Sequence, residues 1–389
     1  MKAPSGAGCG KSWKNRFGYN RRVKQEKRKE IIALALIAAG IAEMLLLKHC
    51  PDVFFPWYRN YSKQWISVLA FLFSFVPFSV WDIGALCIVL AALLMLIRTV
   101  IQRRSIGNLL RTLLLAVSVL LFSALQGWLG NHYAPKLCSS LNLEVKQYSV
   151  EELYETTAFY LLKAAEYAPQ IRRDEAGHAL KEDIFSLAIT AGSSYKELAE
   201  EYPVFQGSSR PVKVFSLIGE YLLYNGIIGM FMPVTGEASV PANVPPVPMP
   251  FTMCHEAAHR LGIASEKEAN FCAFLASTAN PDSRFVYSGY YEGFSYCFSA
   301  LYEADPERAK ELYDRYDDTA GVGLVKLDRA DTHRAYQKYD SPLQDISDEI
   351  NDTYLKTFSQ ESGIRSYGEV TDYLIAWYLN HSSSLQSRA

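Results

Sequence analysis

The sequence lacks any paired arrangement of cysteines. Its 389 residues include seven cysteines, an odd number, and no two of them are spaced as Cys-x-x-Cys. Such scattered thiols argue against a disulfide framework and against a zinc site built from cysteine. The chain also lacks an excess of charge of either sign, because its formal net charge is −2. This balance gives no indication of nucleic acid as a partner.

A complete phosphate-binding loop is also missing. The segment SGAGCGKS, residues 5–12, resembles the GxxxxGK[ST] pattern, but Ser5 stands where that pattern requires its first glycine. Such a loop must join a buried strand to a helix, whereas this segment lies in the basic tail at residues 1–30, ahead of an apolar run. No nucleotide is therefore expected as a ligand.

Long apolar runs are present and are concentrated in a membrane region at residues 31–130. A helix needs about 20 residues to span a hydrocarbon core of roughly 30 Å. A fourth run, at 65–78, is shorter and reaches a proline at its end, which favours an interfacial or re-entrant helix over a further span. The segments predicted to be transmembrane helices are about 31–48, 79–98 and 112–130.

Positive charge predicts the orientation of these helices. Lysine and arginine are frequent in residues 1–30 and in the connection after the second span, and they are sparse in the connection between the first two spans. Basic residues favour the cytoplasmic side of a membrane. We therefore expect a multi-pass protein of the cell (plasma) membrane with a cytoplasmic N-terminus and with residues 131–389 outside the cytoplasm. A fourth span at 65–78 would reverse this arrangement.

The segment FTMCHEAAHRLGIASEKEANFCAF, residues 251–274, contains a His-Glu-x-x-His pattern. Residues four apart lie on one face of a helix, so His255 and His259 can offer their imidazoles to a single metal ion. Glu256 is rotated away from this pair and can reach a water molecule instead. A catalytic zinc site needs three protein ligands, an open position and a carboxylate base. The pattern therefore predicts a Zn²⁺ site with Glu256 as the catalytic base.

The residues after this pattern predict where a third zinc ligand comes from. Gly262 suits the left-handed end of a helix, and SEKE at 265–268 has the form of a capping box. A helix, a tight turn and a second helix would return the chain toward His259. Glu268 would then be committed to the capping box, which leaves Glu266 as the preferred ligand and Glu268 as the alternative.

Four segments of the chain resemble a bacterial multi-pass membrane family catalogued as domain of unknown function 3810, which is grouped with the zincin-like peptidases. The resemblance runs nearly end to end. It implies N-terminal transmembrane helices followed by a mainly α-helical (α+β), zincin-like extracytoplasmic domain with a zinc site, and it implies no particular substrate. The segments are VPFSVWDIGAL (76–86), PVTGEASV (233–240), PFTMCHEAAHRLGIASEKEANF (250–271) and YLKTFSQESGIRSYGEVTDYLIAWY (354–378).

The spacing of the third ligand is similar to that of glutamate-type zincins. ExxAN at 266–270 matches a motif whose first glutamate binds zinc and whose last residue supports a histidine ligand. This resemblance implies Glu266 as the ligand and Asn270 as the supporting residue. The metzincin pattern HExxHxxGxxH fails, because Ser265 stands where it requires a third histidine.

Two further features concern the substrate. GEASV at 236–240 precedes the zinc helix and is either an edge strand that pairs with extended substrate or a connecting loop. Apart from this segment, residues 150–380 are predicted to be helical.

Arg365 and Tyr367 are candidates to stabilise an oxyanion, since developing negative charge needs a positioned donor. Contacts that only stabilise their loop are the alternative.

These features together predict a membrane-anchored zinc metallopeptidase whose partners are the lipid bilayer and a protein or peptide substrate. The substrate would be extracytoplasmic or close to the membrane. The alternative is a non-catalytic membrane sensor or assembly factor with a structural or vestigial zinc site. Glu256 separates the two interpretations, because a purely structural site needs no base.

Overall fold

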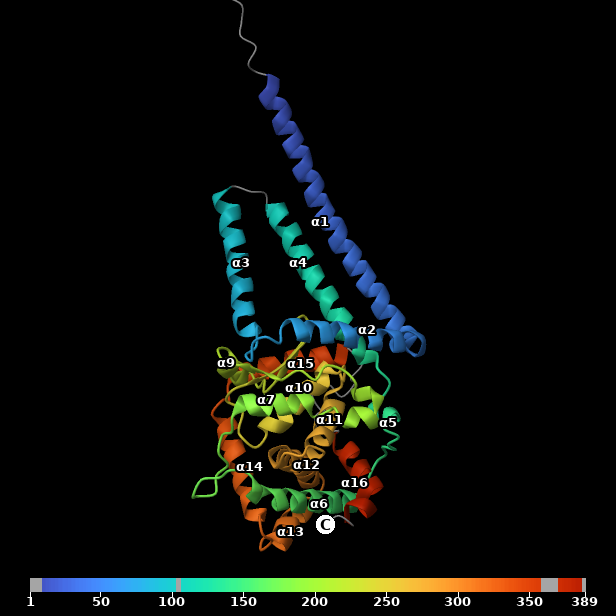
Figure 1. The fold of residues 1–389 in the computed structure, drawn as a ribbon, viewed down its shortest axis with the longest axis vertical. Coiled ribbons are helices and arrows are strands. Elements are labelled where there is room, and N and C mark those ends of the chain that lie inside the picture. The colour runs from blue at the N-terminus through green and yellow to red at the C-terminus, as the bar shows by residue number, and fades with distance from the viewer. Residues whose placement is uncertain (1–8, 103–105, 358–369, 387–389) are drawn as a thin grey trace, which may run out of the picture.

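The computed structural model describes residues 9–102, 106–357 and 370–386, and these residues are mostly helical. Figure 1 shows long helices that project together from one end of a helical domain. The domain begins after the third of these helices and contains a small sheet close to its junction with them. The projecting helices are α1 (Cys9–His49), α3 (Trp81–Ile101) and α4 (Ile106–Gly127).

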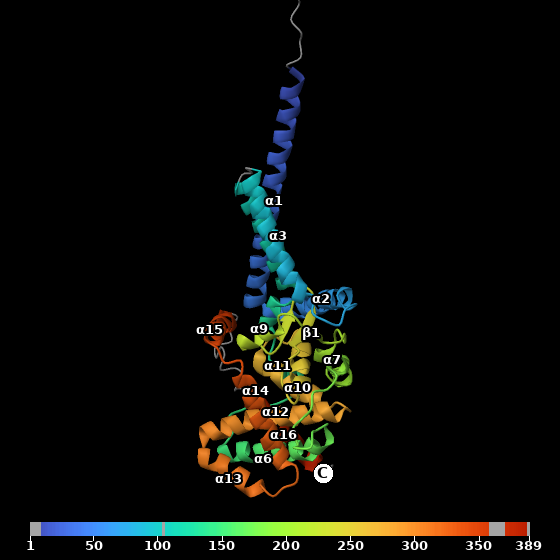
Figure 2. The same ribbon diagram turned by 90° about the vertical axis from the view of Figure 1, so that its left-hand side faces the viewer.

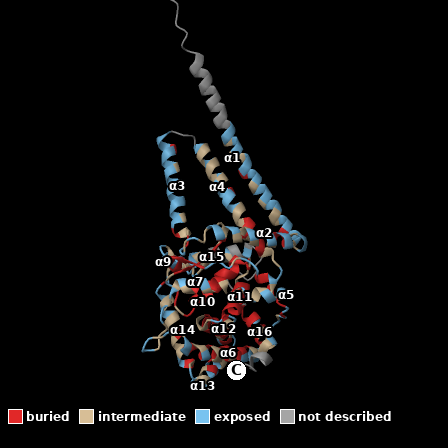
Figure 3. Cartoon of the chain, viewed as in Figure 1, coloured by how far each residue is buried: buried red, intermediate tan, exposed pale blue. Residues whose placement is uncertain are grey.

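These three helices have the length and apolar composition needed to cross a membrane. Few residues are buried in the described part of each helix, and Figure 3 colours most of α3 as exposed and α4 as a mixture of exposed and intermediate. So large an exposed apolar surface is typical of contact with lipid. Three membrane-spanning candidates were predicted, and three are found among the described residues, with bounds Lys24–His49, Trp81–Ile101 and Ile106–Gly127.

The apolar run at 65–78 belongs to a longer helix, α2 (Pro51–Leu72). Figure 1 shows α2 lying across the foot of the projecting helices instead of running alongside them. The rings of Trp57, Tyr61 and Trp65 stack in succession along it, with centroids 5.5 and 6.3 Å apart. Aromatic side chains of this kind are enriched at membrane interfaces. The position of α2 therefore favours the interfacial alternative over a fourth span.

Helix α2 also joins the membrane region to the domain. Tyr58 donates a hydrogen bond of 2.6 Å to the carbonyl of Leu125, near the end of α4. Lys63 Nζ donates to two backbone carbonyls of the domain, those of Val204 at 2.6 Å and Gln206 at 2.7 Å. The domain is thereby held directly beneath this helix.

A three-stranded sheet lies beside α2, in the strand order β1-β3-β2. Strand β3 begins at the second residue of GEASV, Glu237, and pairs with β1 in parallel and with β2 in antiparallel fashion. The expectation of an edge strand or a loop at 236–240 is therefore wrong, because both sides of β3 are already paired. The helical prediction missed β1 and β2, which are too short to show an alternating pattern. The strands are β1 (Lys213–Phe215), β2 (Met230–Met232) and β3 (Glu237–Pro241).

Two of the segments that carry the family resemblance, 76–86 and 233–240, meet at this sheet. The backbone N–H of Val80 donates to Glu237 Oε1 at 3.1 Å. The same carboxylate pairs with Lys213 Nζ at 2.9 Å, and both side chains are buried. A buried ion pair needs such additional hydrogen bonds to offset desolvation. The contacts fix the chain between α2 and α3 to the domain.

The centre of the domain is formed by four helices: α6 (Val150–Tyr167), α10 (Met249–Arg260), α11 (Glu266–Thr278) and α12 (Ser283–Ala304). They carry most of the buried residues seen in Figure 3. The other helices surround them, and Figure 2 shows α15 standing to one side. These are α5 (Leu137–Ser140), α7 (Ile184–Ser193), α8 (Leu198–Glu201), α9 (Gly219–Tyr224), α13 (Pro306–Tyr316), α14 (Val322–Gln337), α15 (Pro342–Thr357) and α16 (Val370–Gln386), with short 3₁₀ turns η1 (Leu129–Tyr133), η2 (Ala168–Gln170) and η3 (Pro203–Phe205).

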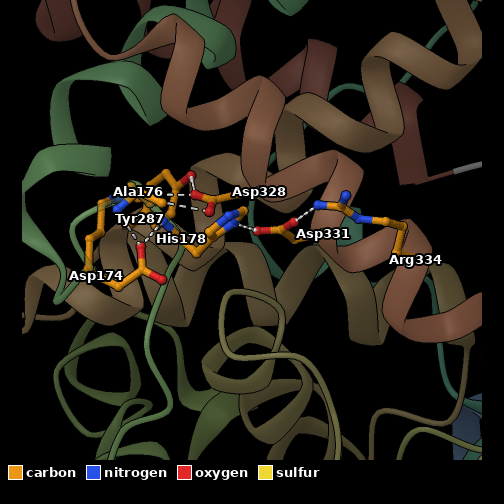
Figure 4. Close-up of polar contacts among 9 residues, drawn as sticks. Asp174, Ala176, His178, Tyr287, Asp328, Asp331 and Arg334 are labelled. Atoms are coloured by element: carbon orange, nitrogen blue, oxygen red, sulfur yellow. Dashed lines mark hydrogen bonds and ion pairs between the residues drawn. The ribbon is translucent and has the colours of Figure 1, made fainter.

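A polar network ties α12 and α14 to the loop that follows η2, as Figure 4 shows. Arg173 binds Asp328 with two hydrogen bonds of 2.9 and 2.7 Å, and Tyr287 donates to the same carboxylate. Nearby, His178 Nδ1 lies 2.5 Å from a carboxylate oxygen of Asp331. The network therefore connects the central helix α12 to two other segments of the chain, α14 and the loop after η2.

Candidate metal centre

The His-Glu-x-x-His pattern lies on α10, within the core of the domain. The helix ends because Gly262 adopts φ +87°, a left-handed conformation that glycine accepts at little cost. The turn reverses the chain into α11, whose first residue is Glu266. His255, Glu256 and His259 are exposed by only 9, 4 and 6%, so the pattern occupies a nearly enclosed position.

Glu266 is brought together with both histidines. Its two carboxylate oxygens lie 3.2 Å from His255 Nε2 and 3.5 Å from His259 Nε2. The imidazole rings are perpendicular, with centroids 4.6 Å apart. One ligand atom from each of the three residues lies within 4.8 Å of the others. Two ligands of a tetrahedral zinc ion, each bound at about 2.0–2.1 Å, are separated by about 3.4 Å. The three side chains therefore fit a zinc ion.

The orientation of His259 comes from the turn that ends α10. Its Nδ1 lies 2.7 Å from the carbonyl oxygen of Ile263. A carbonyl only accepts hydrogen bonds, so Nδ1 carries the proton and Nε2 is left facing Glu266. Histidine ligands of metals are commonly oriented in this way by a contact on the far side of the ring. The residue pattern alone gave no sign of this backbone contact.

Glu268 points away from the histidines and has a different set of partners. It accepts hydrogen bonds from the backbone N–H of Leu137 at 2.7 Å and from Tyr373 Oη at 3.0 Å. The predicted capping box at 265–268 is wrong, because the side chain of Ser265 makes no capping hydrogen bond. Glu268 is therefore unavailable to a metal because it binds Leu137 and Tyr373, and not because it belongs to a capping box.

Asn270 lies one turn after Glu266 on α11 and is buried. No hydrogen bond joins it to either histidine among the described side chains, and its Nδ2 has no partner there. The role of Asn270 in supporting a histidine ligand stays a prediction.

Arg365 and Tyr367, the oxyanion candidates, lie outside the described residues.

The Glu266 carboxylate and the His259 imidazole strongly shift each other's pKa values. Burial disfavours the charged form of Glu266, but the adjacent His259 and His255 outweigh it and hold the pKa of Glu266 well below its usual range. Burial likewise disfavours protonation of His259, but Glu266 prevails and raises the pKa of His259 to about 9. A group of this kind attracts a cation, and a metal ion would take the place of the proton on His259.

Glu256 occupies a separate position beside the three converging residues. Burial raises the pKa of Glu256 to about 7, and a neighbouring cation would oppose that rise. Its Oε2 is buried and has no hydrogen-bond partner among the described residues. Gly229, just before strand β2, packs directly on its carboxylate: a Cβ atom at Gly229 would lie 2.2 Å from Glu256 Oε1. A side chain at position 229 would therefore displace this carboxylate, and glycine allows β2 to approach it so closely.

Two residues beyond the third span complete the surroundings of the site. Trp128 directly follows α4, and its ring meets the ring of His259 edge to face, with centroids 5.3 Å apart. Its ring also lies 5.6 Å from that of His132, whose pKa is lowered to about 4 by burial and by the nearby His259. The sequence pattern missed both residues, because they lie more than 100 positions from the His-Glu-x-x-His segment and have no motif spacing relative to it.

Comparison with known proteins identifies one family. A family model described as "Protein of unknown function (DUF3810)" matches residues 58–375. No curated protein and no solved structure matches the chain. The family match begins within α2 and includes the sheet and the whole described metal centre. Since it covers well over half of the sequence, the chain belongs to the DUF3810 family.

Proposed function

We propose that this protein is a membrane-anchored, zinc-dependent peptidase that hydrolyses a protein or peptide substrate outside the cytoplasm or close to the membrane. One observation carries the proposal. The two imidazoles and the carboxylate of His255, His259 and Glu266 converge within 4.8 Å, and the carboxylate of Glu256 lies beside them. This is the set of three ligands and one base that a zincin-like hydrolytic site needs.

The roles of the residues follow from their positions. His255, His259 and Glu266 would hold a zinc ion, which supplies Lewis-acid polarisation of a carbonyl and activation of water when bound. Glu256 would accept a proton from the attacking water and deliver it to the leaving amine. Its Oε2 has no hydrogen-bond partner among the described residues. This supports the role, because a buried carboxylate oxygen without a partner is free to accept a hydrogen bond from a water molecule.

Strand β2 is a suitable place for the substrate backbone. It forms one edge of the sheet, and Gly229 at its start contacts Glu256. An extended peptide that added a strand to this edge would run past the carboxylate.

The proposed orientation places the N-terminus in the cytoplasm and the domain outside the plasma membrane. The basic residues of the tail and of the connection after the second span support it. The contact between Trp128 and His259 links the end of span α4 to the metal centre, which favours a membrane-proximal substrate.

A second candidate is a sensor or assembly factor with a structural zinc site. The small exposure of His255, Glu256 and His259, all below 10%, favours it, because structural zinc sites are closed. The two candidates differ in their need for Glu256.

The substitution Glu256→Gln tests whether the protein is a peptidase or a sensor or assembly factor. Glutamine preserves the size of the side chain and leaves the three proposed ligands intact, so folding and zinc content should persist. The missing base should lower peptide hydrolysis by about 10²–10⁴-fold. The measurement compares extracytoplasmic peptides of cells that carry the wild type or the variant, together with the zinc content of each purified protein.

His255→Ala is the matched control, because it should lose both zinc and hydrolysis. Full complementation of a deletion phenotype by the zinc-loaded Glu256→Gln variant would reject the enzymatic function and favour the sensor.

A further inference from the structure

A cavity lies between α2 and the domain, and none of the three candidate metal ligands lines it. Its volume is about 210 Å³. It is bounded by the end of α2, the following segment at residues 74–77, helix α7 and the start of β1. Arg260, which directly follows the metal-site residue His259, forms part of its inner wall.

The outer border of this cavity is apolar and exposed. Phe75, between α2 and α3, is 77% exposed, and Ile189 on α7 is 62% exposed. Phe185 is a further exposed aromatic residue on the same border, and the exposed Phe71 lies next to it beneath the guanidinium of the lining residue Arg210. This apolar surface continues into α2, which lies across the foot of the candidate membrane spans in Figure 1. Side chains at this level would meet the headgroup and upper acyl region of a bilayer.

The polar part of the cavity wall has an excess of positive charge. Lys213 and Glu237 form an ion pair and cancel each other. Arg210 and Arg260 remain, and neither is paired with a carboxylate within the described part of the chain. The guanidinium of Arg210 lies over the ring of Phe71, 4.9 Å from its centroid.

Arg260 is the second observation that points to an anion. It is 3% exposed, and its terminal nitrogens donate to the backbone carbonyls of Arg210 and Pro211. Its Nε is buried and has no acceptor in the described structure. A buried cation without a counter-ion is unfavourable, so negative charge in the adjacent cavity would be stabilised.

We propose that this cavity binds an anionic phospholipid of the surrounding bilayer. The lipid phosphate would lie at Arg210, where Arg260 adds to the positive potential, and one acyl chain would extend along Phe75, Phe185 and Ile189. Juxtamembrane arginines commonly recognise anionic headgroups, and the apolar wall matches an acyl chain. A free phosphate ion would leave that wall in water, so the combined chemistry selects a lipid.

The test uses the full chain in phosphatidylcholine nanodiscs. A small fraction of lipid is replaced with phosphatidylglycerol or phosphatidylcholine that carries the same photoreactive acyl chain. Labelled peptides are then identified by mass spectrometry. We expect phosphatidylglycerol to label residues 70–77 and 185–189 roughly tenfold more than phosphatidylcholine, as one charge-assisted contact would produce.

Arg210→Gln should abolish this preference, whereas Arg315→Gln, at an exposed position on α13, should retain it. Ile189→Ser should lower labelling by both lipids. Equal labelling by the two lipids, or an unchanged preference in Arg210→Gln, would overturn the proposal. Loss of labelling upon addition of inorganic phosphate alone would assign the cavity to a free anion and would also overturn it.

Discussion

Glu266 and Glu268 lie two positions apart and have opposite surroundings. On a helix this separation turns one side chain almost fully away from the other. Glu266 faces His255 and His259 at 3.2 and 3.5 Å. Glu268 faces the opposite side of α11, where Leu137 and Tyr373 donate to it. One carboxylate is available to a metal, and the other holds α5 and α16 against the core.

This difference predicts separable effects of substitution. Glu266→Ala should reduce bound zinc from about one ion per chain to nearly none, because two histidines are insufficient for a three-ligand site. Glu268→Ala should retain zinc and lose about 1–3 kcal/mol of folding free energy, because the buried N–H of Leu137 is left without an acceptor. Elemental analysis measures the zinc, and denaturant unfolding measures the stability.

Glu268→Gln provides the matched control, since its amide oxygen can still accept from Leu137 and should restore most of the stability. Loss of zinc in Glu268→Ala together with its retention in Glu266→Ala would show that Glu268 is the ligand.

Among the helices, α12 and α14 depend on a buried ion pair as well as on apolar packing. Asp328 on α14 is 1% exposed and binds both Arg173 and Tyr287. Figure 4 shows Asp328 beside Tyr287. Tyr287 belongs to α12, which packs against α10. The network therefore supports the metal centre from behind without contacting it.

Asp328→Asn should destabilise the domain strongly, by about 3–5 kcal/mol, because it leaves the largely buried guanidinium of Arg173 without its counter-charge. Asp317→Asn is a suitable comparison, since Asp317 pairs with Lys326 and its side chain is 68% exposed. That variant should lose less than about 1 kcal/mol. Chemical unfolding of both variants measures the difference, and equal losses would contradict a structural role for the buried pair.

In the complete molecule, α2 is the joint between the membrane region and the metal centre. It lies across the foot of the three candidate spans in Figure 1 and bonds to both α4 and the domain. With three spans and an interfacial α2, as proposed above, the two ends of the membrane region would lie on opposite sides of the bilayer. The candidate metal centre would then lie on the side opposite the basic N-terminal tail.

Reporter fusions test this topology. A reporter that is active only outside the cytoplasm should be active when fused after residue 140 or at the C-terminus, and silent when fused after Arg104. The physical reason is the cytoplasmic retention of the basic connection at Arg104. The reverse pattern of activity would mean that α2 spans the membrane and that the domain faces the cytoplasm.

Much of the arrangement was predictable because it depends on residues close together in the chain. Apolar runs of spanning length identify three helices, since the requirement concerns length and composition alone. The four-residue separation of His255 and His259 places them on one helical face. Gly262 was expected at a left-handed helix end and has φ +87°.

The remaining features depend on segments that meet only after the chain has folded. The EASV part of GEASV lies in a central strand because β1 and β2 pair with its two sides, and neither β1 nor β2 has a recognisable pattern of its own. Trp128 and His132 reach the metal centre because α4 ends above it, and Gly229 reaches Glu256 because β2 lies beside α10. Local spacing specifies which side chains share a helical face. Long-range packing specifies which distant backbone approaches that face, and no local property of the sequence encodes that approach.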